Sequence, residues 1–139
     1  MRFVSFLLSV VTALTAVVTF MVALSSGFTD DPHDPVTPWS RALLGDAGAL
    51  VVLGLLAAIL IWFKPAAAEK MLWCAAVLGV AGMAMSGITF VVSTNPTPPP
   101  LSFKVLSVLL SGAIPAVAAA TGAIMTRRLL KPEERVALA

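Results

Sequence analysis

Long apolar runs alternate with short polar segments along the chain. Each run is close to the roughly 20 residues that a helix needs to cross the hydrocarbon core of a bilayer. The runs are continuous and do not alternate in polarity at every second residue, so they do not fit transmembrane β-strands. The sequence therefore predicts an all-α integral membrane protein that folds as an antiparallel bundle of four transmembrane helices. The apolar runs are Phe3–Leu24, Leu43–Phe63, Met71–Ser93 and Val105–Thr126.

The polar segments divide this single domain, residues 1–139, into helices and connections. We expect helices at about residues 3–26, 38–63, 70–94 and 103–128. The expected connections are extracytoplasmic loops at 27–37 and 95–102, a cytoplasmic turn at 64–69, and a cytoplasmic tail at 129–139.

The second apolar run has the clearest boundaries. Trp39 and Trp62 would lie roughly 35 Å apart on a helix that rises 1.5 Å per residue, so the two indoles can mark the two membrane interfaces. Pro38 suits the first turn of a helix, where its missing N–H would have no partner. Lys64 and Pro65 suit the end, because a cation favours the helix C-terminus and a proline resists continuation.

Charge gives the chain an orientation. Of its 139 residues 59% are hydrophobic and 12% charged, and the cations cluster at helix ends rather than in one patch, which argues against nucleic-acid binding. One side of the predicted bundle holds most of the basic residues, and by the positive-inside rule it is cytoplasmic, with both termini. We expect a multi-pass protein of a bacterial inner membrane, in contact with membrane lipids. The basic residues on that side are Arg2, Lys64, Lys70, Arg127, Arg128, Lys131 and Arg135.

The first apolar run could also be a secretory signal peptide. Arg2 precedes it, and Ala23–Ser25 could form a cleavage site. The run is longer than the usual apolar core of about 7–15 residues, so we expect a retained transmembrane helix.

Small and hydroxyl-bearing residues recur at alternating spacings of four and three in the first and third helices. Such a stripe lets helix backbones approach closely in lipid, where packing and hydrogen bonds replace hydrophobic drive. Both stripes are predicted to face protein, although residues of these types are abundant enough for chance to produce the pattern. The candidates are Ser5, Ser9, Thr12, Ala16 and Thr19 in the first helix, and Ala75, Gly79, Gly82, Ser86 and Thr89 in the third.

Asp46 is the deepest charge of the second helix. A carboxylate one to two turns below the interface is costly unless it meets a cation or water, so we expect an interfacial pair with Arg41 or Lys104. A carboxylate that serves transport is the alternative. In the fourth helix, Pro115 should leave the carbonyl of Ser111 without its usual donor and produce a kink.

Reactive chemistry is sparse. The segment DDPHD at residues 30–34 holds the only histidine and three carboxylates, but its spacing favours a solvated loop or a docking segment over a metal site. No catalytic triad, metalloprotease motif or nucleotide-binding loop is present, and no predicted span offers a histidine to a haem. We predict no enzymatic activity, cofactor or metal site.

Helices with few charges and many small residues are typical of proteins that pack against other protein. We therefore expect a non-catalytic accessory or assembly subunit that stabilises a larger membrane complex, with other membrane subunits as partners. The alternative is a small oligomeric transporter or channel that uses Asp46, the hydroxyl stripes and the kink at Pro115.

Overall fold

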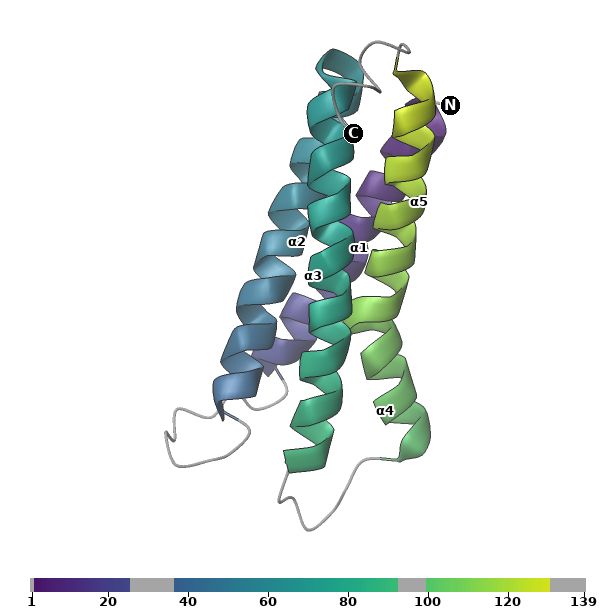
Figure 1. Ribbon diagram of the computed structural model, residues 1–139. Helices are drawn as coiled ribbons and strands as arrows, with labels where there is room; N and C mark the ends of the chain where they lie inside the picture. Colours follow the sequence, from purple (N-terminus) through teal and green to yellow (C-terminus); the bar gives the residue numbers. More distant parts are fainter. Residues whose placement is uncertain (1, 26–36, 93–99, 131–139) are drawn as a thin grey trace.

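The computed structural model describes residues 2–25, 37–92 and 100–130, which are almost entirely helical (Figure 1). Residues 27–36 of the first expected loop, which include the acidic segment at 30–34, residues 95–99 of the second, and residues 131–139 of the tail lie outside the described part of the chain. The helices are α1 (Arg2–Ser25), α2 (Thr37–Phe63), α3 (Pro65–Val92), α4 (Leu101–Val108), the π-helix η1 (Leu109–Ala113) and α5 (Ile114–Leu129).

The fold provides four helical spans that are long and apolar enough to cross a membrane. They are Arg2–Met21, Pro38–Phe63, Pro65–Val92 and Leu101–Leu129, the last of which joins α4, η1 and α5. Consecutive spans run in opposite directions, and the start of α1, the junction of α2 with α3 and the end of α5 lie at one end (Figure 1). Helix α1 packs on α2 and α5, and α3 packs on the other sides of the same two helices.

A single residue connects α2 to α3, because α3 begins at Pro65 and not at residue 70. Lys64 still donates its N–H to the carbonyl of Leu60 in α2, at 2.6 Å, and its own carbonyl accepts from Ala67 and Ala68 at 3.1 Å. Pro65 tolerates this first helical position, since its missing N–H would have no partner there. The expected turn at 64–69 is thus mostly helix, and Glu69 belongs to the third span.

The fourth span contains one π-helical turn at η1. The N–H of Ile114 bonds to the carbonyl of Leu109, five residues earlier, instead of to that of Leu110. Pro115 follows within the first turn of α5 and has no N–H to donate. The irregularity expected at Pro115 is therefore a change of hydrogen-bond register just before the proline. Single π-turns inside α-helices are frequent at functional sites.

Small side chains fill the interior of the bundle. Ala16, Ala57, Ala75, Ala119 and Ala123 are all fully buried, one or two from each span. Large apolar side chains point outwards on every span, as expected of helices that meet lipid. Close contact between backbones is therefore the main feature of the packing.

Two glycines make the closest of these contacts possible. A Cβ on Gly79 would lie 2.8 Å from both the backbone nitrogen and the Cβ of Ala116 in α5. A Cβ on Gly112, in η1, would collide with the carbonyl oxygen of Gly79 and with Met83. Helix α3 and the broken fourth span thus touch through glycine and alanine, with no room for larger residues.

Candidate functional site

The strongest candidate for a functional group is the carboxylate of Asp46. It projects from α2 into the bundle and is only 7% exposed. Both of its oxygens are buried, and no group in the described part of the chain forms a hydrogen bond with either. A buried carboxyl group inside an apolar span is costly and is therefore a functional candidate by default.

Gly82 creates the space that Asp46 occupies. A Cβ on Gly82 would lie 2.6 Å from Oδ2 of Asp46 and equally 2.6 Å from the carbonyl oxygen of Ser111. The two oxygens, from α2 and η1, therefore reach the same gap beside α3. A side chain at position 82 would fill the gap and displace one of them.

Thr19 of α1 lies at the same depth in the bundle as η1, which contains Ser111. Its Oγ1 lies 3.0 Å from the carbonyl oxygen of Leu110 in η1 and 3.0 Å from that of Thr15 in its own helix. In the π register, residue 115 would donate its N–H to Leu110, and Pro115 cannot. The Thr19 hydroxyl supplies a donor at that carbonyl.

Four residues from α1, α2, α3 and η1 form a buried polar layer near the end of the bundle opposite the α2–α3 junction. We call it the Asp46 layer. The hydroxyl proton of Ser111 is directed to the carbonyl of Val108, 3.4 Å away, and that of Thr19 to backbone carbonyls, so neither reaches the carboxylate. Beside Oδ2 of Asp46 the layer thus offers a hydrogen-bond acceptor, the carbonyl of Ser111. The layer consists of Thr19, Asp46, Gly82 and Ser111, all of which are buried.

No hydrogen bond joins Asp46 to either of the two cations expected to pair with it. Arg41 is exposed, and Lys104 lies half-buried on α4. Arg41 precedes Asp46 by five residues, which places the two about 140° apart around a helix with 3.6 residues per turn. Neither cation forms a hydrogen bond with the carboxylate oxygens. In the described part of the chain, the carboxylate oxygens of Asp46 thus have no hydrogen-bond partner.

Both small-residue stripes point into the chain's own bundle. In α1 all five candidates (Ser5, Ser9, Thr12, Ala16 and Thr19) are buried. The hydroxyls of Ser9 and Thr12 bond to carbonyls one turn earlier in α1, at 2.9 Å. In α3 the candidates Ala75, Gly79, Gly82 and Ser86 are buried, and Thr89 is half-buried with its hydroxyl 2.8 Å from the carbonyl of Met85. The stripes therefore pack spans of one chain together.

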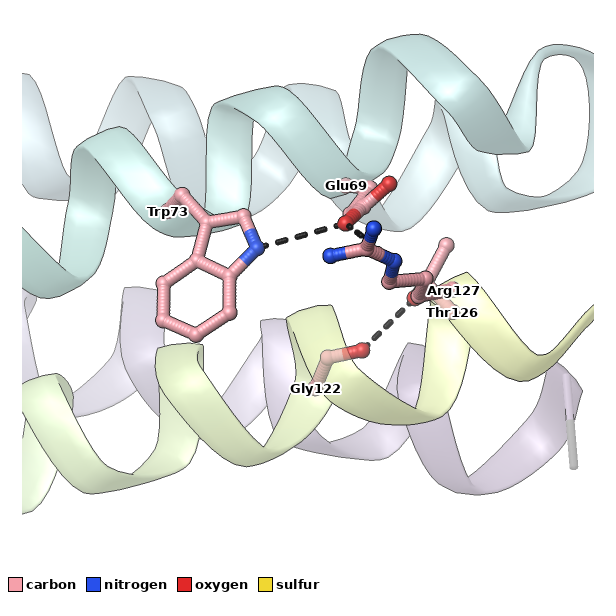
Figure 2. Close-up of polar contacts among 5 residues, drawn as sticks. All are labelled: Glu69, Trp73, Gly122, Thr126 and Arg127. Carbon is pink, nitrogen blue, oxygen red and sulfur yellow. Dashed lines mark hydrogen bonds and ion pairs between the residues drawn. The ribbon is translucent and has the colours of Figure 1, made fainter. Parts of the chain in front are cut away.

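A second buried carboxylate, Glu69, lies near the opposite end of α3. Its Oε1 accepts a hydrogen bond from Nε1 of Trp73 at 3.3 Å and lies 4.0 Å from Nε of Arg127 in α5, as Figure 2 shows. Beside Arg127, the Thr126 hydroxyl donates to the carbonyl of Gly122 at 2.7 Å. The side chain of Glu69 is 4% exposed and that of Arg127 is 48% exposed, so the pair links the interior to the surface.

Sequence reasoning missed Glu69 because it assigned the residue to a turn. The spacing of the α3 stripe could have shown that the helix includes Glu69: continued backwards from Ala75, the alternation of three and four reaches Leu72 and Ala68, which are also fully buried. Trp73, one helical turn after Glu69, is a second signal, since an indole N–H can donate to a carboxylate at that spacing.

Metal ligation has no support from the described residues. Among residues 2–25, 37–92 and 100–130, no three histidine, cysteine, aspartate or glutamate side chains gather around one point. Cys74 is a free, exposed thiol. The acidic segment at 30–34, with the histidine, lies outside this part of the chain.

Four apolar spans in one helical bundle make the chain a candidate multi-pass membrane protein. No protein-family profile matches it, and comparisons with curated proteins and with solved structures find no similar chain. Its function is therefore argued from the geometry of the bundle.

Proposed function

We propose that the protein is a small membrane transporter that carries a cation through the Asp46 layer. The observation that carries the proposal is the buried carboxylate of Asp46, which no described group pairs, beside a break in the fourth span. Such a carboxylate is costly to keep in a bilayer, and a cationic ligand would offset that cost.

The break in the fourth span supports this proposal. Many membrane transporters place their binding sites where a spanning helix is interrupted, because the interruption releases backbone carbonyls towards a ligand. Here the carbonyl oxygen of Ser111, which belongs to the π-turn η1, lies at the gap beside Gly82 that Oδ2 of Asp46 also reaches. Release of α4 and η1 from α3 would open the layer to one side of the membrane.

The packing favours a transporter over an open channel. Alanine and glycine fill the interior between the Asp46 layer and Glu69, with Ala75, Gly79 and Ala119 all buried. A continuous water-filled pore would need polar lining along that stretch. Passage would instead require alternating access to Asp46.

One observation favours a second function, that of an accessory subunit in a larger membrane complex. Helix α4 buries none of its residues, and Leu101, Val105 and Leu106 are at least half exposed. A helix of another subunit could cover this face. Recovery of a stoichiometric partner after mild solubilisation, lost when Val105 and Leu106 are replaced by tryptophan, would support this function.

We further infer that both termini face the cytoplasm of a bacterial inner membrane. Most basic residues of the described chain gather at the end of the bundle that holds the α2–α3 junction: Lys64 at the junction itself, and Arg2, Lys70, Arg127 and Arg128 near the ends of helices. Short cytoplasmic segments carry an excess of such residues.

Flux measurements in proteoliposomes test the transport proposal. Purified protein would be reconstituted with pH-, Na⁺- and K⁺-sensitive dyes inside the vesicles, and a gradient of one cation imposed at a time. We expect flux of one cation from wild type, loss of that flux in Asp46→Asn, and unchanged flux in Val52→Ala, which alters an exposed side chain on the same helix. Absence of flux for all three cations, or equal flux in Asp46→Asn, would refute the proposal.

A further inference from the structure

We propose that the ligand of the Asp46 layer is a proton, held on the carboxyl group of Asp46, and not a metal cation. The inference rests on the proposed function, because it names the cation that this layer would carry. It also makes a claim about binding alone, which can be tested whether or not the protein transports.

The number of oxygen ligands argues against a metal cation. Hard cations such as Ca²⁺ take about six to eight oxygen ligands, and Mg²⁺ demands a near-complete octahedron. The oxygens nearest to the gap beside Gly82 are Oδ2 of Asp46 and the backbone carbonyl of Ser111. Thr19 and Ser111 direct their hydroxyl protons to other carbonyls, and the carbonyl of Leu110 already accepts from Thr19.

The small space beside Gly82 also argues against a metal cation. Oδ2 of Asp46 and the Ser111 carbonyl already lie so close to Gly82 that even a methyl group there would collide with both. A hydrated metal ion is much larger than a methyl group. A proton requires no additional volume.

Hydrogen-bond complementarity favours a proton directly. An ionised carboxylate can only accept hydrogen bonds, and no described donor serves Asp46. A carboxylic acid has one O–H to donate, and the Ser111 carbonyl borders the same gap as an acceptor. The neutral acid therefore matches its surroundings, whereas the anion meets a second acceptor.

The described charged residues on the surrounding helices do not supply Asp46 with a hydrogen-bonded cation that would favour its ionised form. On α2 the nearest cation in sequence is Arg41, which lies on a different face, and on α4 Lys104 precedes Ser111 by seven residues, about two turns. Helix α1 has one described charged side chain, Arg2, at the opposite end. The charged residues of α3 and α5 that the structure describes, Glu69, Lys70, Arg127 and Arg128, are also at that end.

Labelling with dicyclohexylcarbodiimide tests the proposal on the full chain in lipid bilayers. This apolar reagent needs a protonated carboxyl: the acid proton goes to a carbodiimide nitrogen, the carboxyl oxygen bonds to the central carbon, and rearrangement leaves an N-acylurea. The whole reagent is added and no group leaves. Peptide mapping by mass spectrometry then separates Asp46 from Glu69.

We expect the Asp46 peptide to gain the mass of one carbodiimide at neutral pH, with no change when excess NaCl or KCl is present. Asp46→Asn should abolish this label, and gel filtration would verify that the variant remains folded. Infrared spectra provide a second measurement: wild type should show the carbonyl band of a protonated carboxyl group that Asp46→Asn lacks.

The results separate the inference from the proposed function. Protection of Asp46 by Na⁺ or K⁺, or absence of both the label and the infrared band, would overturn the proton assignment even if a cation flux is measured. Label and band without any flux would support the proton assignment and contradict the transport proposal.

Discussion

The hydroxyl of Thr19 lies 3.0 Å from the carbonyl oxygen of Leu110, across the contact between α1 and η1. This hydrogen bond joins residues 91 positions apart in the sequence. It provides a donor to the carbonyl that the π-turn and Pro115 together leave without one. The first helix thus stabilises the break in the last span, directly beside the Asp46 layer.

Replacement of Thr19 by valine should destabilise the bundle by about 0.5–2 kcal/mol. The substitution keeps the shape of the side chain but leaves the Leu110 carbonyl unsatisfied, and hydrogen bonds in membrane proteins have modest net energies. Unfolding in a mixed-detergent titration measures the change. Thr15→Val is the matched control, because the Thr15 hydroxyl bonds only to carbonyls of its own helix. Equal losses in the two variants would show that the contact with Leu110 contributes nothing.

Pro115→Ala should reduce the effect of Thr19→Val. An alanine at this position restores a backbone N–H, which can donate within the fourth span and make the Thr19 hydroxyl less necessary. A double-mutant cycle with the same unfolding assay measures the coupling between the two sites. We expect Thr19→Val to cost less in the Pro115→Ala background, and strictly additive effects would contradict this relationship.

Gly79→Ala should destabilise the protein by about 1–3 kcal/mol, because the new methyl group would collide with the backbone of Ala116 and force α3 away from α5. Gly87→Ala, on the same helix, is the control: a Cβ at that position meets no atom within 4 Å. We expect the control to be neutral or slightly stabilising, since alanine favours a helix over glycine by about 0.5–1 kcal/mol. A stable Gly79→Ala variant would show that α3 and α5 can separate at little cost.

Glu69→Ala should lower stability by about 1–2 kcal/mol. It removes the acceptor of the Trp73 indole and the carboxylate near Arg127, and it opens a small cavity between α3 and α5. The half-exposed guanidinium of Arg127 can turn to water or lipid headgroups, which limits the loss. Lys70→Ala, at an exposed neighbouring position, should change stability by less than about 0.5 kcal/mol. Unfolding of both variants at the same detergent fraction would contradict a stabilising role for Glu69.

The orientation can be tested with single cysteines at Lys64 and Ser102, two exposed positions at opposite ends of the bundle, in a Cys74→Ala background. In intact cells we expect a membrane-impermeant maleimide to label Ser102→Cys and to reach Lys64→Cys only after lysis. The reverse pattern would place the termini outside, and labelling of both in intact cells would disprove the four-span topology.

The sequence by itself determined the four helices, because about 20 continuous apolar residues in each run fit the bilayer thickness. It also determined which faces turn inwards: Ser5, Ser9, Ala75 and Gly79 follow helical spacing, and small residues permit the close approach that helices in lipid require. Local rules were enough here, since each depends only on neighbours along one helix.

Tertiary structure decided how the polar groups combine. Pro115 predicted a missing donor at the Ser111 carbonyl, but only the structure shows that a π-turn precedes the proline and that the Thr19 hydroxyl meets the carbonyl of Leu110 there. Sequence spacing likewise could not reveal that Asp46 would meet Ser111 across the gap at Gly82, nor that Glu69 would approach Arg127. These contacts join different spans, and their partners are fixed by the depth and rotation of each helix in the packed bundle. That arrangement depends on all the helices at once.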